Sequence, residues 1–145
     1  MNASYPPRRP GLPGIVAATL VSFAVYSGMA FADQIKVTLS GDQEVPAVKT
    51  GASGGGTISV NPDMTVSGSV TTTGVAGTMA HIHEAATGKN GPVIIPLTKN
   101  GDTWSVPAGA KLTEAQFAAY KAGDLYVNVH SAEHKGGEIR GQLKP

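Results

Sequence analysis

Short segments of alternating or β-branched residues, separated by glycine, proline and asparagine, run through most of this 145-residue chain. From Gln34 to Ser40, polar and apolar residues alternate with the two-residue period of a strand that has one buried face. We expect Ile35, Val37 and Leu39 to point inward. Nineteen glycines and ten prolines supply a fifth of the chain, and turn signals at intervals of about ten residues are typical of antiparallel sandwiches and barrels.

The segments that follow extend this pattern. Thr57–Val60 and Met64–Thr72 flank the turn residues 61–63 and predict a hairpin, whereas the glycine-rich stretch Gly41–Gly56 is predicted to be a loop. Further strands are expected at Gly77–Glu84, Val93–Leu97, Thr103–Val106, Asp124–His130 and Glu138–Leu143. We therefore predict an all-β fold, an antiparallel Greek-key or Ig-like sandwich or a barrel.

One segment, Thr113–Ala122, has helical character. Thr113 and Gln116 match a capping box, the middle of the segment is rich in alanine, and Gly123 stands where a helix usually ends. We expect one short helix among the strands.

The N-terminus resembles a secretory signal. Arg8 and Arg9 precede an uncharged, largely apolar stretch from Pro10 to Ala32, which ends in the small-x-small motif Ala30-Phe31-Ala32. We predict a signal peptide at residues 1–32 and a periplasmic or secreted protein of residues 33–145 with no membrane segment. The alternative is a retained transmembrane anchor, because the uncharged stretch is about long enough to span a bilayer.

Composition excludes several kinds of site and partner for residues 33–145. The chain has no cysteine, which excludes disulfides, thiolate metal sites and cysteine nucleophiles. Eleven basic and ten acidic residues leave almost no positive excess, so nucleic acid is not an expected partner. A metal ion would have to be held by histidine, methionine, carboxylate or backbone ligands.

All four histidines fall in two places, His81 with His83 and His130 with His134. On a strand, Met79, His81 and His83 share one face, because side chains alternate between faces. The same alternation buries Leu125, Val127 and Val129 and places Tyr126, Asn128 and His130 on the opposite face. In the last predicted strand, it exposes Glu138, Arg140 and Gln142. If these strands are neighbours, the polar groups lie on one sheet face.

This clustering predicts a metal site formed by His81, His83 and His130, with Met79 or His134 as a fourth ligand. Imidazoles with a thioether suit copper, with zinc as the second choice, and calcium is disfavoured because no dense carboxylate loop is present. The competing interpretation is that these histidines are ordinary solvated residues and Met79 a packing residue. Arg140 is expected to pair with Glu138 or another acid across the sheet, rather than with an anion near the metal.

Four fragments resemble the CHRD domain, a module named after its occurrence in chordin. They are Leu39–Pro46, Ala80–Val93, Leu125–Ser131 and Gly136–Leu143, in this order, and the resemblance covers nearly all of residues 33–145. It implies an extracytoplasmic β-sandwich of Ig-like or Greek-key type, in which the His-x-His and Asn-x-His motifs are suspected metal positions.

A weaker resemblance connects Ala80–Glu84, Val127–His130 and Gly137–Arg140 with copper/zinc superoxide dismutase, where corresponding histidines hold copper and a late arginine guides an anion. This chain lacks the disulfide cysteines and the zinc loop of that enzyme. We expect an exported copper-binding and copper-handling protein, with another periplasmic copper protein as a partner. The alternatives are a dismutase-like copper oxidoreductase and a metal-free extracellular adhesion or interaction module, and the sequence favours binding over catalysis.

Overall fold

The computed structural model describes residues 1–3 and 32–145. The predicted signal peptide, residues 1–32, falls outside this range except for its first three residues and Ala32. The elements in chain order are β1 (Asp33–Ser40), the 3₁₀ turn η1 (Gly41–Gln43), β2 (Ser53–Val60), β3 (Val66–Thr73), β4 (Gly77–Glu84), β5 (Val93–Pro96), β6 (Thr98–Asn100), β7 (Thr103–Ser105), α1 (Glu114–Lys121), β8 (Leu125–Ser131) and β9 (Ile139–Leu143).

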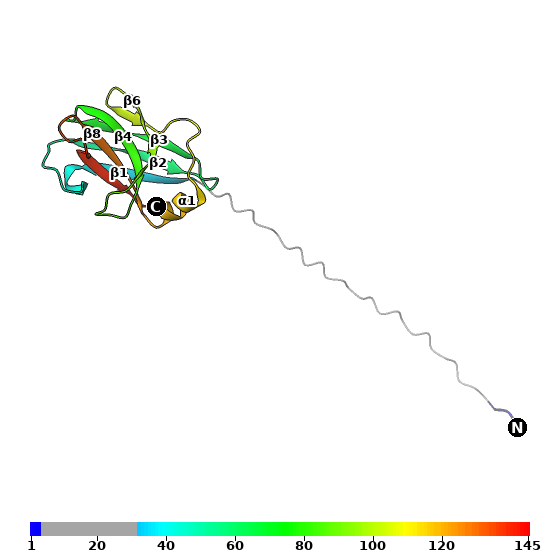
Figure 1. Ribbon diagram of the computed structural model, residues 1–145. Coiled ribbons are helices and arrows are strands. Elements are labelled where there is room, and N and C mark those ends of the chain that lie inside the picture. Colours follow the sequence, from blue (N-terminus) through cyan, green and yellow to red (C-terminus); the bar gives the residue numbers. More distant parts are fainter. Residues whose placement is uncertain (4–31) are drawn as a thin grey trace.

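The strands form one antiparallel sheet in the order β5-β4-β8-β9-β1-β2-β3-β7-β6. In Figure 1, β8 (orange) lies between β4 (green) and β9 (red), although about forty residues separate β4 from β8 along the chain. The ends of the sheet approach each other, since Lys99 on β6 donates to the carbonyl of Gly77 on β4. The sheet is therefore nearly closed, and the prediction of an all-β sandwich or barrel with one short helix is confirmed.

The core lies on one face of this sheet. Ile35, Val37 and Leu39 are buried as predicted, and they pack in one cluster with Ala80, Ile82, Leu125, Val127, Val129, Ile139 and Leu143. Burial of alternate residues on β4 and β8 fixes the register of these strands, because a slip of one residue would move every apolar side chain to the other face.

Two details of the sheet differ from the sequence-based expectation. The prediction of a loop over Gly41–Gly56 is wrong at its end, because β2 begins at Ser53. A side chain at Gly56 would overlap the backbone of Ser69 and Val70 on β3, so these glycines let two strands approach closely rather than mark a turn. The three-residue strand β6 was not predicted, since its exposed sequence Thr-Lys-Asn has no apolar alternation.

The predicted helix is present. The hydroxyl of Thr113 accepts from the backbone N–H of Gln116, and the Gln116 side chain accepts from the backbone N–H of Thr113. Gly123 has φ of 80° at the end of the helix. Burial and the nearby carboxylate of Asp33 raise the pKa of Tyr120, the buried residue of the helix, to about 12.

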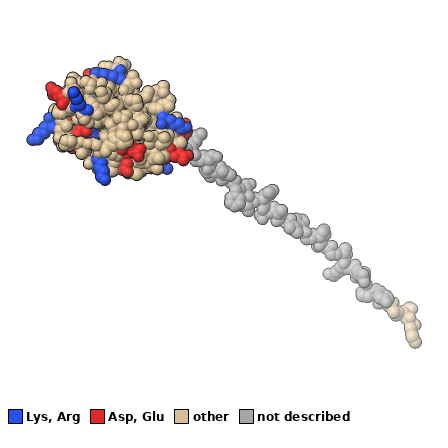
Figure 2. All heavy atoms as spheres, in the orientation of Figure 1, with Lys and Arg blue, Asp and Glu red and all other residues tan. Residues whose placement is uncertain are grey.

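Two features of the described residues bear on helix length and on surface charge. Among residues 1–3 and 32–145, no helix is long and apolar enough to cross a membrane. On the face that Figure 2 shows, basic and acidic side chains are interspersed rather than separated by sign.

Candidate metal centre

The predicted polar face exists at the junction of β4 and β8. The antiparallel register pairs Met79 with His130, His81 with Asn128 and His83 with Tyr126, and directly paired residues share a face. Their chain neighbours Ala80 and Ile82 point into the core. The alternation of β4 and β8 therefore presents the histidines of both strands on the face opposite the core.

Three imidazoles converge on this face. Nδ1 of His81 lies 3.1 Å from Nε2 of His130, and one nitrogen from each of His81, His83 and His130 lies within 4.8 Å of the other two. The ring centroids of His81 and His83 are 5.5 Å apart, and those of His81 and His130 are 4.9 Å apart. These three predicted ligands are thus brought together by two strands that are distant in sequence.

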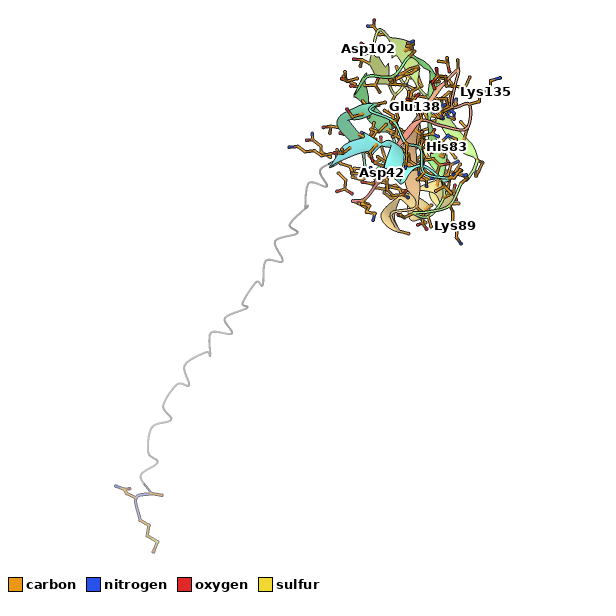
Figure 3. The ribbon with its side chains drawn as sticks, turned by 90° about the vertical axis from the view of Figure 1, so that its left-hand side faces the viewer. Asp42, His83, Lys89, Asp102, Lys135 and Glu138 are labelled. Carbon is orange, nitrogen blue, oxygen red and sulfur yellow. The ribbon has the colours of Figure 1, made fainter. Side chains whose placement is uncertain are left out.

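Backbone carbonyls determine which nitrogens face the centre. Nδ1 of His83 lies 2.9 Å from the carbonyl oxygen of Gly91, and Nδ1 of His130 lies 2.9 Å from that of Lys135. A carbonyl only accepts, so both Nδ1 atoms carry a proton and both Nε2 atoms carry a lone pair. The same reasoning makes Nδ1 of His81 the donor to Nε2 of His130. In Figure 3, His83 lies between the loops that carry Lys89 and Lys135.

The site is buried on one side and open on the other. His83 and His130 are each 7% exposed, whereas His81 is intermediate. Nε2 of His83 is buried and has no hydrogen-bond partner among the described residues. Burial lowers the pKa of His81 and of His83, and the neighbouring His130 and, for His83, Arg140 lower it further. These two imidazoles are therefore neutral at pH 7, the form that binds metal ions.

The spacing suits a small, nitrogen-preferring ion. Nitrogens that bind one zinc or copper ion at about 2.0–2.1 Å lie roughly 2.9–3.4 Å apart for bond angles of about 90–110°. The separation between the nitrogens of His81 and His130, 3.1 Å, falls within this interval. The unpartnered Nε2 of His83 supplies a further lone pair. The nitrogens of His81 and His130 could therefore bind one such ion without moving apart, and the second ring nitrogens of His83 and His130 are already hydrogen-bonded, as is usual for metal-binding histidines.

The two predicted alternatives for a fourth ligand lie at different distances from this group. Met79 is opposite His130 on the same face and is 50% exposed. His134 lies in the loop after β8, outside the three-histidine group, and its backbone N–H and carbonyl hold the turn with Ser131 and Gly137. Its side chain lines a surface pocket of about 460 Å³ with Glu44.

The prediction of exposed side chains is wrong for Glu138 and Arg140, because loops cover this part of the face, whereas Gln142 is half-buried. Arg140 is 1% and Glu138 8% exposed. The guanidinium of Arg140 donates to the carbonyl of Lys89 and to the side chains of Asn90 and Gln142. Glu138 does not take the predicted role of its partner and instead accepts from the hydroxyl of Thr50.

The acid whose charge acts on Arg140 is Glu44, which the sequence did not single out. Glu44 is 5% exposed; burial raises the pKa of its carboxyl and the charge of Arg140 opposes this rise. Gly137 lies directly against the Glu44 carboxylate and the Asn128 amide. The fragment around Glu44 was part of the sequence resemblance, and this packing gives it a structural reason.

A comparison of the sequence with models of protein families identifies the family of this domain. The CHRD domain model matches residues 35–143, which include β1 from its third residue and all of β2 to β9. The chain belongs to the CHRD domain family. The CHRD domain indicates an extracellular or periplasmic module. No curated protein and no solved structure matches the chain significantly, so residue roles within this CHRD domain have to be argued from its own geometry.

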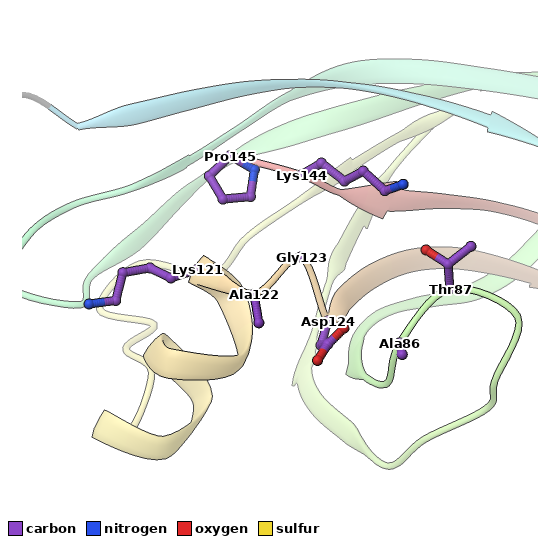
Figure 4. A pocket seen from close by; sticks show the side chains of 8 residues that line it. All are labelled: Ala86, Thr87, Lys121, Ala122, Gly123, Asp124, Lys144 and Pro145. Atoms are coloured by element: carbon purple, nitrogen blue, oxygen red, sulfur yellow. The ribbon is translucent and has the colours of Figure 1, made fainter.

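A second surface pocket, also about 460 Å³, lies away from the histidines. Figure 4 shows its lining at the end of α1, the loop after β4 and the C-terminus, with Lys121, Asp124 and Lys144 at its edge. Its lining residues include no histidine and none of the buried unpartnered polar atoms among the described residues.

Proposed function

We propose that this CHRD domain is an exported copper-binding protein that handles copper in the periplasm or outside the cell. The observation that carries the proposal is the convergence of His81, His83 and His130, in which backbone carbonyls bond Nδ1 of His83 and of His130 and leave Nε2 of each ring facing the centre. Solvated histidines on an ordinary strand have no need of two such carbonyls, or of a buried Nε2 without a partner.

Copper is favoured over zinc for two reasons. Copper stands above zinc in the order of affinities for a given nitrogen site. In addition, Met79 offers a thioether, which is a soft ligand, opposite His130. Zinc remains the second choice for the same imidazoles. The half-exposed His81 leaves one side of the site accessible to a protein that gives or receives the ion.

The test is metal content followed by a copper titration. The exported protein is purified without an affinity tag, its metals are measured by mass spectrometry, and copper(II) is added while paramagnetic resonance spectra are recorded. We expect one copper ion per chain with nitrogen hyperfine structure. We expect this signal to be lost in the double variant His81→Ala/His83→Ala.

The matched control is His134→Ala, which removes an imidazole from the same region but outside the three-histidine group. It should retain the one-to-one stoichiometry and the spectrum. A double variant that binds copper as tightly as the unmodified protein would refute the proposal. A protein that binds no metal ion at all would leave the adhesion or interaction module as the better explanation.

A further inference from the structure

A stack of three side chains leads from the candidate metal centre into the protein. The ring of Tyr126 lies parallel to the ring of His83, with centroids 4.7 Å apart and an interplanar angle of 3°. The guanidinium carbon of Arg140 lies 3.4 Å from the centroid of the Tyr126 ring. These two contacts place a buried positive charge no more than about 8 Å from the His83 ring.

The charge of Arg140 is not balanced at the metal site itself. All three members of the ligand group are imidazoles, so the site supplies no negative charge. The stack places the Tyr126 ring, and no carboxylate, between Arg140 and His83. The carboxyl whose charge acts on Arg140, that of Glu44, lies outside the three-histidine group. An ion held by His83 therefore experiences the repulsion of a guanidinium.

Repulsion by a fixed positive charge is twice as large for a doubly charged ion as for a singly charged one. We propose that this site selects monovalent soft cations, Cu(I) above all, against divalent ions, and that the stacked Arg140 is the residue that imposes this selection. The inference rests on the proposed function, because it specifies the ion that the three histidines hold. Tyr126 acts as a spacer that keeps the guanidinium close while excluding it from coordination.

Met79 supports the same selection by independent chemistry. Its thioether is opposite His130 and half exposed, and thioethers favour Cu(I) over harder divalent ions. It is one of only two large hydrophobic side chains in residues 32–145 that are strongly exposed, the other being Val93 opposite His83. An exposed methionine at the open side of a neutral ligand set is a suitable fourth donor for a monovalent ion.

The expected size of the Arg140 effect follows from Coulomb's law. At roughly 9 Å and an effective dielectric constant of about 20–40, one additional unit of ion charge is disfavoured about five- to twentyfold. Removal of the charge should reduce the preference for monovalent over divalent ions by this factor. A tenfold change corresponds to about 59 mV in the reduction potential of the bound copper.

The experiment measures dissociation constants of the unmodified protein and its variants for Cu(I), for Ag(I) as a redox-inert monovalent ion, and for Zn(II) and Cu(II). Cu(I) titrations are done anaerobically against a competing chelator. In the unmodified protein, equimolar Zn(II) should not displace Ag(I). Arg140→Gln should lower the ratio of monovalent to divalent affinity five- to twentyfold, whereas Arg140→Lys, which keeps the charge, should retain most of it.

Two further variants make the result specific. Lys111→Gln removes one exposed positive charge that solvent screens, and it should leave the ratio unchanged. Met79→Leu, at an exposed position, should weaken Cu(I) and Ag(I) binding while leaving Zn(II) binding intact. It keeps the proposal testable should Arg140→Gln fail to fold.

The possible outcomes separate the two proposals. If none of the four ions binds, the proposed function and this inference are both refuted. If the protein binds metal ions but neither Arg140→Gln nor Met79→Leu changes the ratio of monovalent to divalent affinity, only the inference is overturned. Displacement of Ag(I) by equimolar Zn(II) in the unmodified protein would also overturn the inference, with metal binding itself retained.

Discussion

Gly137→Ala tests the packing beneath the candidate site in a single substitution. Gly137 has φ of 129°, a conformation that L-residues rarely adopt, and a methyl group there would overlap the Glu44 carboxylate and the Asn128 amide. Backbone strain of this kind costs about 1–3 kcal/mol, and displacement of a buried polar group from its partners costs about 1–3 kcal/mol more. We therefore expect the free energy of unfolding to fall by about 2–6 kcal/mol.

Urea denaturation monitored by the fluorescence of Trp104, the single tryptophan, measures this loss. For a domain of this size, roughly 4 °C per kcal/mol implies a decrease of about 8–24 °C in the melting temperature. The control is Gly136→Ala, one residue earlier. A methyl group there meets nothing within 4 Å, and Gly136 does not have the positive φ that an alanine would resist. Equal stability of the two variants would refute the packing argument.

Two further predictions concern pH and the helix. Because the pKa values of His81 and His83 are lowered in the folded state, the unfolded chain binds more protons below about pH 6.5, and stability falls as the pH decreases from there. Urea unfolding from pH 7.5 to pH 5 should show this fall in the free energy of unfolding, at most about 1.4 kcal/mol per pH unit for each histidine. The same dependence on pH in His81→Ala/His83→Ala would contradict the prediction. Thr113→Ala removes the capping box of α1 and should cost about 1 kcal/mol; Thr78→Ala, in which the lost hydroxyl bonds only one carbonyl, is the comparison, and an indistinguishable loss would contradict a specific capping effect.

The sheet and the identity of the three converging histidines were accessible from the sequence. Alternation of apolar residues on β4 and β8 reports which residues share a face, because a buried core tolerates only one register. The capping box of α1 is likewise a local pattern that Thr113 and Gln116 reveal by their spacing. The glycine stretch before Thr57 led to the wrong prediction of a loop where β2 begins, because glycine occurs both in turns and where two strands approach closely.

The loops that bury part of the polar face could not be predicted from the sequence, because their positions depend on contacts between distant segments. Alternation placed Arg140 on the correct face but gave no sign that the loop carrying Lys89 and Asn90 would bury it. The carbonyls of Gly91 and Lys135 belong to the backbone, so their side chains carry no signal of their role. Glu44 gains its environment from Arg140, nearly one hundred residues later in the chain.

The hydrogen bond between His81 and His130 has a kinetic consequence. Nδ1 of His81 uses its proton to bond Nε2 of His130, and an ion held between the same two nitrogens has to replace that proton. Loading of the proposed metal ion would therefore include a tautomer change in the His81 ring. If this proton step limits uptake, buffer bases that speed imidazole proton exchange should speed metal uptake without altering the final affinity.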